Sequence, residues 1–285
     1  MFRPTPILRL HLPNHHILEV ERKFGPTPLS ISLLTQNSGL PAFPRHVARP
    51  SLVFEDTYFD RNDVLSKQGV YVRRRRYLDA RKPAKGQGEG EKLEKLNKLD
   101  HWEAKVRISG DFTRSAFQEL HGFDAVARVV RERFPNFLQH QYQHRHDHDH
   151  HHHPQHHSQA LASKAVAEDK EGEGKLDFPF LDVLARFITH RRQWLINERF
   201  HVVLDEADFG HIVGEVELAH ESTRSGAEGK GQAEVGEDKD LAKKLDAEIS
   251  SFMSQHRWAF QQGEGEVQGK LSAYFAWKKR AEGGA

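Results

Sequence analysis

The sequence predicts an α+β domain built mainly from antiparallel strands, with a few helices. Runs in which apolar and charged residues alternate, the period of a pleated strand, recur along most of the chain. Helical spacing of apolar residues is confined to a few segments, and polar stretches separate the two kinds of run. We therefore expect one domain, residues 1–285, in which an antiparallel sheet carries the core.

The composition excludes several functional classes. Lys+Arg number 42 and Asp+Glu 41, so the net charge of +1 gives no basis for binding nucleic acid or a membrane surface. The chain has no Cys, which excludes disulfides, thiolate zinc sites and a Cys nucleophile and fits a reducing compartment. No apolar run approaches the roughly 20 residues of a membrane helix. We expect a cytoplasmic monomer, although the acid-free first 18 residues also resemble a transit peptide.

The expected strands are short runs in which apolar residues alternate with charged ones. They are residues 17–24, 52–60, 69–77, 101–108, 186–196, 199–205 and 211–219. The first run, in ILEVERKFG, would bury Leu, Val and Phe on one face and present two Glu and one Lys on the other. Asn197-Glu198 lies between two of the runs and predicts a tight hairpin turn.

Helical spacing is found in fewer segments. They are residues 113–121, 124–134, 239–254 and 270–280. Asp124 is the expected N-cap of the second helix. The third helix places its large apolar residues on one face: Leu241, Leu245, Ile249 and Phe252.

Three polar, low-complexity stretches interrupt these elements. They are residues 79–100, 139–175 and 221–240. Such compositions bury too little apolar surface to offset the entropy lost on ordering, so we expect disordered insertions between strands. The His-rich tract at 140–157 lacks the spacing of a zinc site, and we expect it to be an insertion with incidental affinity for Zn²⁺ or Ni²⁺.

Like charges recur two residues apart on single strand faces. The pairs are Glu19/Glu21, Glu215/Glu217 and Arg73/Arg75. One charged strand face is usually just solvated, but charges about 7 Å apart in repeated pairs repel unless a counter-ion relieves them. Acidic pairs favour a divalent cation and basic pairs a polyanion. If the strands close into a barrel with these faces inside, the inferred ligand is a triphosphate with Mg²⁺ or Mn²⁺.

The motifs on these strands resemble those of the CYTH superfamily, the triphosphate tunnel metalloenzymes. The pattern Glu19-x-Glu21-x-Lys23 is similar to the signature of that family. Supporting motifs follow in the family's order: DTYFD (56–60), VRRRR (72–76), WEAK (102–105), ITHRRQW (188–194), LDEADFGHIVGEVEL (204–218) and GKLSAY (269–274). DxADFG followed by GEVE is typical of thiamine triphosphatases. The resemblance covers residues 17 to about 280 and implies an eight-stranded antiparallel barrel that binds triphosphate and a divalent metal.

The resemblance also implies a role for each matching residue. The implied metal ligands are Glu19, Glu21, Glu215 and Glu217, to which we add Asp205 as a substitute for an aspartate of the family. The residues implied in catalysis are Glu217, Glu19 and Glu21. The residues implied to bind the substrate are Lys23, Arg73, Arg75, Lys105, Arg191, Lys270 and Tyr71.

Two positions depart from the family pattern. Val203 stands where related enzymes have an Asp ligand, and we expect Asp205, about 7 Å along the same strand face, to substitute for it. Tyr71 stands where animal thiamine triphosphatases have a Trp that stacks on the thiamine ring. Tyr keeps an aromatic face there but offers a weaker platform.

These patterns and the resemblance predict a metal-dependent hydrolase that converts thiamine triphosphate to thiamine diphosphate and phosphate. Inorganic triphosphatase activity and, with less support from the motifs, adenylate cyclase activity stay open because they share the same tunnel. A binding module that senses triphosphate or polyphosphate without hydrolysis is the alternative from another class. The four paired carboxylates argue against a pure anion binder, whereas Val203 keeps that alternative open.

Overall fold

The computed structural model describes residues 14–79, 100–134, 178, 180–224, 231–260 and 266–283. Its strands are β1 (Asn14–Phe24), β2 (His46–Asp60), β3 (Val70–Asp79), β4 (His101–Gly110), β5 (Arg114–His121), β6 (Asp182–Ile196), β7 (Phe200–Ala207) and β8 (Ile212–Arg224). Its helices are α1 (Pro28–Gln36), α2 (Val64–Lys67), α4 (Phe123–Arg133), α6 (Gly231–Gln255), α7 (Arg257–Phe260) and α8 (Lys270–Gly283).

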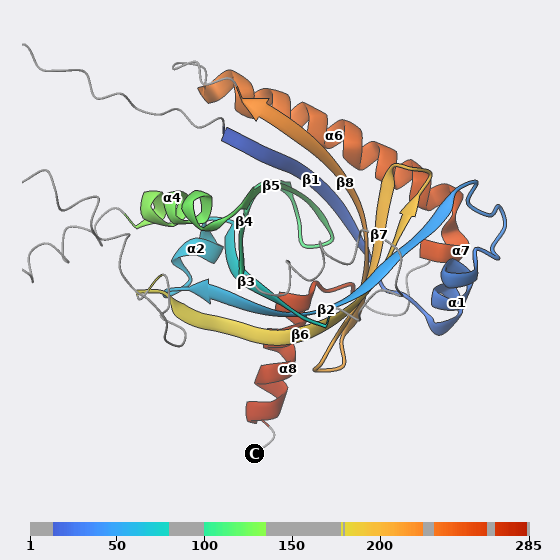
Figure 1. The fold of residues 1–285 in the computed structure, drawn as a ribbon, viewed down its shortest axis with the longest axis horizontal. Helices are drawn as coiled ribbons and strands as arrows, with labels where there is room; N and C mark the ends of the chain where they lie inside the picture. Colours follow the sequence, from blue (N-terminus) through green and yellow to red (C-terminus); the bar gives the residue numbers. More distant parts are fainter. Residues whose placement is uncertain are drawn as a thin grey trace, which may run out of the picture.

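The eight strands close into one antiparallel barrel with helices around it (Figure 1). The order around the ring is β1-β5-β4-β3-β2-β6-β7-β8, and β1 pairs with β8 to complete it. The predicted eight-stranded antiparallel ring is therefore confirmed. Closure gives every strand two neighbours and creates an inner face that alternate residues of each strand line.

The outer face of the ring carries the apolar residues, as the alternation predicts. Leu18 and Val20 of β1 form one core cluster with Leu245, Ile249 and Phe252 of α6. In Figure 1 this long helix lies along the outside of β1 and β8. Helix α6 covers the face of β1 that carries Leu18 and Val20. The residues that alternate with them, Glu19 and Glu21, must therefore point into the ring.

Two further helices cover other parts of the ring. Val126 and Val130 of α4 pack with Trp102 and Ala104 on the outer face of β4. Helix α8 starts at one end of the ring, where Leu271 packs with Phe187 of β6. The first residue of α8 is Lys270, so this packing brings its side chain to the inner face.

The predicted helix at 113–121 is wrong, because most of this segment forms strand β5. Ala116 packs outside the ring with the cluster under α6, whereas Phe117 points into the ring and is also buried. Leu120 packs outside as well. Apolar residues on both faces of one strand reproduce the i, i+3, i+4 spacing of an amphipathic helix, which is why the pattern misled.

Smaller differences concern the ends of elements. Helix α4 has Gly122 and not Asp124 as its N-cap, and Asp124 lies in its first turn. Strand β2 begins at His46, earlier than predicted, with a register shift between Arg49 and Leu52 around Pro50, which cannot donate a ladder hydrogen bond. The short helices α1, α2 and α7 were not predicted from the sequence.

The hairpin turn predicted at Asn197-Glu198 is confirmed. Both residues have left-handed backbones, with φ of 52° and 56°, and the Arg199 amide donates to the Ile196 carbonyl oxygen at 3.1 Å. This geometry is that of a type I′ turn, whose twist matches the twist of paired strands.

The predicted insertions fall largely outside the described residues. Residues 80–99 and 135–177, and with them the His-rich tract, are not described. The stretch predicted at 221–240 is shorter, since β8 runs to Arg224 and α6 starts at Gly231, leaving only 225–230 undescribed. Lys, Glu and Ala also favour helices, so composition alone did not locate the start of α6. Within the described residues, no helix is long and apolar enough to cross a membrane.

Candidate active site in the barrel

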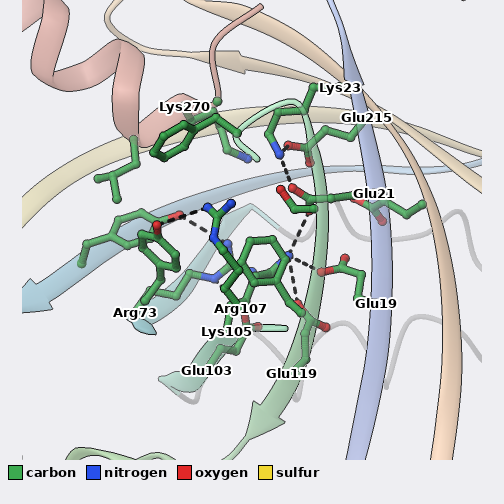
Figure 2. A pocket seen from close by; sticks show the side chains of 18 of the residues that line it. Glu19, Glu21, Lys23, Arg73, Glu103, Lys105, Arg107, Glu119, Glu215 and Lys270 are labelled. Atoms are coloured by element: carbon green, nitrogen blue, oxygen red, sulfur yellow. Dashed lines mark hydrogen bonds and ion pairs between the residues drawn. The ribbon is translucent and has the colours of Figure 1, made fainter. Parts of the chain in front are cut away.

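A cavity of about 320 Å³ lies inside the ring, at the low end of the volumes typical of small-molecule sites. Charged side chains dominate its lining (Figure 2). The basic ones are Lys23, Arg73, Arg75, Lys105, Arg107, Arg191 and Lys270. The acidic ones are Glu19, Glu21, Glu103, Glu119, Glu215 and Glu217. With Tyr71 also in the lining, the structure brings together every predicted site residue except Asp205.

Four of these carboxylates lie on the neighbouring strands β1 and β8 and form what we call the acidic wall: Glu19, Glu21, Glu215 and Glu217. The β1–β8 register places Glu21 directly opposite Glu217 and Lys23 opposite Glu215. Like charges directly opposite each other destabilise a sheet unless a cation separates them. In this structure, lysine ammonium groups supply that positive charge.

Two lysines form ion pairs with three carboxylates of the acidic wall. The Lys105 ammonium on β4 contacts Glu19 and lies 3.4 Å from Glu21 and 3.1 Å from Glu119 (Figure 2). Lys23 contacts Glu21 and lies 3.4 Å from Glu215. Although burial disfavours the charged forms, the carboxylates raise the pKa of both lysines, mainly Glu21 for Lys23 and Glu19 for Lys105. Both lysines therefore carry full positive charge.

The two carboxylates of β1 differ in protonation behaviour. Burial raises the pKa of Glu19 well above its usual value, and the nearby Glu119 acts in the same direction. Burial would also raise the pKa of Glu21, but Lys105 and Lys23 overcome this and hold it at about 2. Glu21 is consequently the permanently ionised carboxylate of the pair, and Glu19 is the one that exchanges a proton more readily.

Buried aspartates hold the guanidinium groups in place. Asp56 accepts two hydrogen bonds from Arg75, at 2.7 and 2.8 Å. Asp205 accepts two from Arg191, both at 2.7 Å, and also contacts the Lys270 ammonium. Such two-point pairs fix the plane of each guanidinium, so its remaining N–H groups keep a set direction.

Val203 and Asp205, the position of the family's aspartate and its predicted substitute, lie on the same strand. Both are fully buried on β7, and Val203 is the register partner of Glu215. Both oxygens of Asp205 are taken up by Arg191 and Lys270, and Asp205 is not among the residues that line the cavity. Its role as a substitute metal ligand stays a prediction.

Glu217 of the acidic wall has a hydrogen-bonded neighbour outside it. Its Oε2 lies 2.8 Å from Nδ1 of His201, the register partner of Glu217 on β7. Nε2 of His201 lies 3.1 Å from Oε1 of Gln193, whose amide nitrogen donates to the Pro50 carbonyl oxygen. Burial opposes ionisation, but His201 and Arg191 together lower the pKa of Glu217, so its carboxylate is ionised at neutral pH.

Several residues of this site were not predicted from the sequence. Glu119 and Phe117 were missed because their segment was read as a helix, although Phe117, Glu119 and His121 follow the alternation of a strand. Asp56 is the first residue of the motif DTYFD and lies two residues after Phe54, on the same face of the strand. Burial of Asp56 could therefore be expected, and both side chains are fully buried. Its pairing with Arg75 depends on the β2–β3 register, which the sequence does not specify.

The ion pair of Asp56 makes the fold sensitive to acid. Burial would raise the pKa of Asp56, but Arg75 and Arg73 lower it to about 2, against about 3.9 in an unfolded chain. A lowered folded-state pKa stabilises the fold above the unfolded value and loses this contribution as the pH falls toward the folded value. We expect the free energy of unfolding to fall by on the order of 2 kcal/mol per such group between about pH 4 and pH 2.

Urea unfolding of the wild type and of the Asp56→Asn variant at a series of pH values checks this. The variant should lose less stability than the wild type over the same pH interval, because it no longer carries this titrating group. Parallel pH dependences of the two proteins would contradict the assignment.

The acidic wall fits a hard divalent cation by the chemistry of its donors. Carboxylate oxygens are the ligands that Mg²⁺ and Mn²⁺ prefer, and the wall places two pairs of them on adjacent strands. Among the described residues, no group of three or more Asp, Glu or His side chains is already arranged as a metal site. Glu19 and Glu21 of β1 form ion pairs with the ammonium groups of Lys105 and Lys23. A metal bound by these glutamates would therefore replace the lysine nitrogens as their positively charged partner.

Comparisons with known proteins return solved structures only. No protein-family model and no curated protein matches the sequence. A candidate adenylate cyclase from Vibrio parahaemolyticus has 12% identity, with 90% of this chain and 98% of that one covered and a TM-score of 0.41. A Pyrococcus horikoshii protein has 11% identity, coverages of 92% and 99%, and a TM-score of 0.44. A candidate adenylyl cyclase from Hippeastrum, described as having a dominant triphosphatase activity, has 15% identity, coverages of 92% and 95%, and a TM-score of 0.43. Similarity at this level does not assign a function to this chain.

Proposed function

We propose that this chain is a metal-dependent triphosphate hydrolase and that thiamine triphosphate is its substrate. One observation carries the proposal: one cavity inside the ring is lined by the acidic wall on β1 and β8 and by guanidinium and ammonium groups on β1, β3, β4, β6 and α8. A polyanion alone would need only the cations, and a metal alone only the carboxylates. A triphosphate that carries a divalent metal needs both in one place.

The cations would bind the phosphate oxygens. These residues are Lys23, Arg73, Arg75, Lys105, Arg191 and Lys270. The guanidinium groups that Asp56 and Asp205 hold would approach the substrate with a fixed plane, which suits bidentate contact to phosphate and costs no reorganisation during the reaction. The lysines would be released from the acidic wall as the triphosphate and the metal enter.

The acidic wall would hold the metal and supply the base. Glu19, Glu21, Glu215 and Glu217 would bind Mg²⁺ or Mn²⁺, which neutralises charge on the phosphate oxygens when bound. Glu217, ionised and hydrogen-bonded to His201, would orient the attacking water and take its proton. The water oxygen then forms a bond to phosphorus, the anhydride P–O bond breaks, and the diphosphate leaves with the bonding electrons.

Turnover assays with a panel of substrates test this proposal. With Mg²⁺ present, we expect phosphate release from thiamine triphosphate and inorganic triphosphate, a higher kcat/KM for thiamine triphosphate, and slower or no turnover of ATP. Chelation with EDTA should abolish release, and added Mg²⁺ or Mn²⁺ should restore it. Turnover that survives EDTA would contradict the role of the acidic wall, and the absence of any phosphate release would contradict the hydrolase.

A module that binds triphosphate without hydrolysis is the second candidate. The observation in its favour is that Asp205 is engaged by Arg191 and Lys270 while Val203 occupies the inward position opposite Glu215, which leaves one carboxylate fewer on that side. Saturable calorimetric binding without phosphate release would favour this candidate over the hydrolase.

A further inference from the structure

Three cations of the cavity converge on one buried aromatic ring. The guanidinium carbon of Arg75 lies 3.8 Å from the ring centre of Phe54, that of Arg191 lies 5.5 Å from it, and the Lys270 ammonium lies 5.7 Å from it. All three distances lie within the range in which a cation is attracted to the face of a ring. We call Arg75, Arg191 and Lys270 the cation cluster.

The members of the cation cluster come from distant parts of the chain. Arg75 lies on β3, Arg191 on β6 and Lys270 at the start of α8, and all three line the cavity. Phe54 lies on β2, between β3 and β6 in the ring, and is fully buried. Because Phe54 is not among the residues that line the cavity, its ring supports the cations from behind and does not itself meet a ligand.

The two aspartates that hold the cluster do not balance its charge. Asp56 accepts two hydrogen bonds from Arg75, and Asp205 is shared by Arg191 and Lys270. Two aspartates thus face three cations, which repel one another in a buried place. A third carboxylate would relieve this repulsion but would also cancel the charge that attracts phosphate. An aromatic ring attracts cations without neutralising them, so it holds them together while they stay available to an anion.

The cation cluster lies beside the acidic wall. A guanidinium nitrogen of Arg191 is 3.9 Å from a carboxylate oxygen of Glu215. A phosphoryl group bound by the cluster would therefore lie next to the carboxylates that are proposed to hold the metal. Three donors from three elements can contact separate oxygens of one phosphoryl group.

We infer that Phe54 is a positioning residue, whose ring holds the cation cluster together as one subsite for a single phosphoryl group of the triphosphate. Without the ring, the three cationic side chains would move apart under their mutual repulsion, and the triphosphate would have to bring them together again when it binds. The cost of that rearrangement would appear as weaker binding. The inference rests on the proposed function and deepens it, because it assigns the arrangement of three substrate-binding residues to a side chain that does not touch the substrate.

A ring of similar shape but altered charge distribution tests this role. Replacing Phe54 with pentafluorophenylalanine keeps a flat six-membered ring but removes the negative charge of its face, so that packing is kept and the attraction for cations is lost. We expect Kd for inorganic triphosphate, measured by calorimetric titration with Mg²⁺, to rise by about fivefold or more, with a matching rise in KM for phosphate release. Phe54→Leu, which removes the ring, should show at least the same loss of affinity.

The same replacement at Phe24 is the matched control. Phe24 is also fully buried on a strand of the ring, but it packs edge-on against Phe260 in the apolar cluster under α6. Pentafluorophenylalanine at position 24 should leave Kd and KM for triphosphate unchanged. Urea unfolding of both fluorinated proteins checks that each keeps a cooperative fold.

The outcomes separate the role of Phe54 from the proposed function. If fluorination at Phe54 leaves Kd unchanged or lowers it, the ring serves packing alone, and the inference fails while the hydrolase stands. Equal losses of affinity from fluorination at Phe54 and at Phe24 would overturn it too, because they would reflect a general disturbance of the fold. If the wild type binds triphosphate but releases no phosphate, the hydrolase fails, and Kd still decides the role of Phe54. If the wild type binds no triphosphate, both fail.

Discussion

Replacing Glu19 or Glu21 with Gln is expected to abolish metal-dependent turnover of triphosphate, with a loss in kcat of about a hundredfold or more. Each substitution removes a negative oxygen from the acidic wall while keeping the volume and hydrogen-bonding capacity of the side chain. Glu21 is the stronger test because its pKa of about 2 keeps it ionised at any working pH. Phosphate release with Mg²⁺, measured with inorganic triphosphate, gives the result.

The fold should survive these substitutions. Without the charge of Glu21, Lys23 keeps Glu215 at 3.4 Å, and Lys105 keeps Glu19 and Glu119. Glu206→Gln is the control, since Glu206 lies on β7 but is exposed and absent from the cavity lining. A cooperative melting transition for all three variants, with activity lost only in the first two, would support the site. Full activity of Glu19→Gln and Glu21→Gln with Mg²⁺ would show that the acidic wall is not the metal site.

The Asp56→Asn substitution should have the largest effect on stability. Asp56 is fully buried, and its loss leaves the guanidinium of Arg75 buried without a counter-charge, on top of the Phe54 ring at 3.8 Å. Breaking a buried ion pair on one side costs about 3–5 kcal/mol, a large share of the stability of an ordinary domain. Urea unfolding of the wild type and the variant near neutral pH measures this change in free energy.

Two controls test whether the loss of stability in Asp56→Asn comes from the buried ion pair: a substitution in an ion pair at the surface and a variant that replaces both partners of the buried pair. Asp100 also binds arginines, the exposed Arg76 and the half-buried Arg74, but Asp100 itself is exposed, so Asp100→Asn should cost no more than about 1 kcal/mol. Replacing both partners, as Asp56→Leu with Arg75→Met, should recover much of the lost stability because no lone charge stays buried. Equal effects of Asp56→Asn and Asp100→Asn would contradict the importance of the buried pair.

Strand alternation was enough to predict the inner and outer faces of the ring. In β1, Leu18, Val20 and Phe24 lie on the side that α6 covers, so period alone separates them from Glu19 and Glu21, and Arg22 on that side pairs with Asp246 of α6. The same holds for β8. The rule failed in β5, where Phe117 is apolar but lines the cavity, with the centre of its ring 5.3 Å from the Lys105 ammonium.

The partners of the charged residues could not be predicted in the same way. That Asp56 faces Arg75, or that Asp205 faces Arg191, depends on the register between β2 and β3 and between β6 and β7, which the paired strands fix only on folding. The sequence pattern also predicted no role for Arg107, although this residue lines the same cavity as the other cations. Only the structure separates Arg107, held by rings, from cations that are held by carboxylates.

Calorimetric titration of the protein with inorganic triphosphate in the presence of Mg²⁺ tests the central claim most directly, because it measures binding in the cavity whether or not hydrolysis follows. We expect one triphosphate bound per chain, with affinity at least about tenfold weaker in Arg191→Gln and unchanged in Arg199→Gln, a substitution of an exposed arginine that is paired with Glu248 outside the ring. Absence of saturable binding to the wild type, or equal binding by both variants, would contradict a triphosphate site inside the barrel.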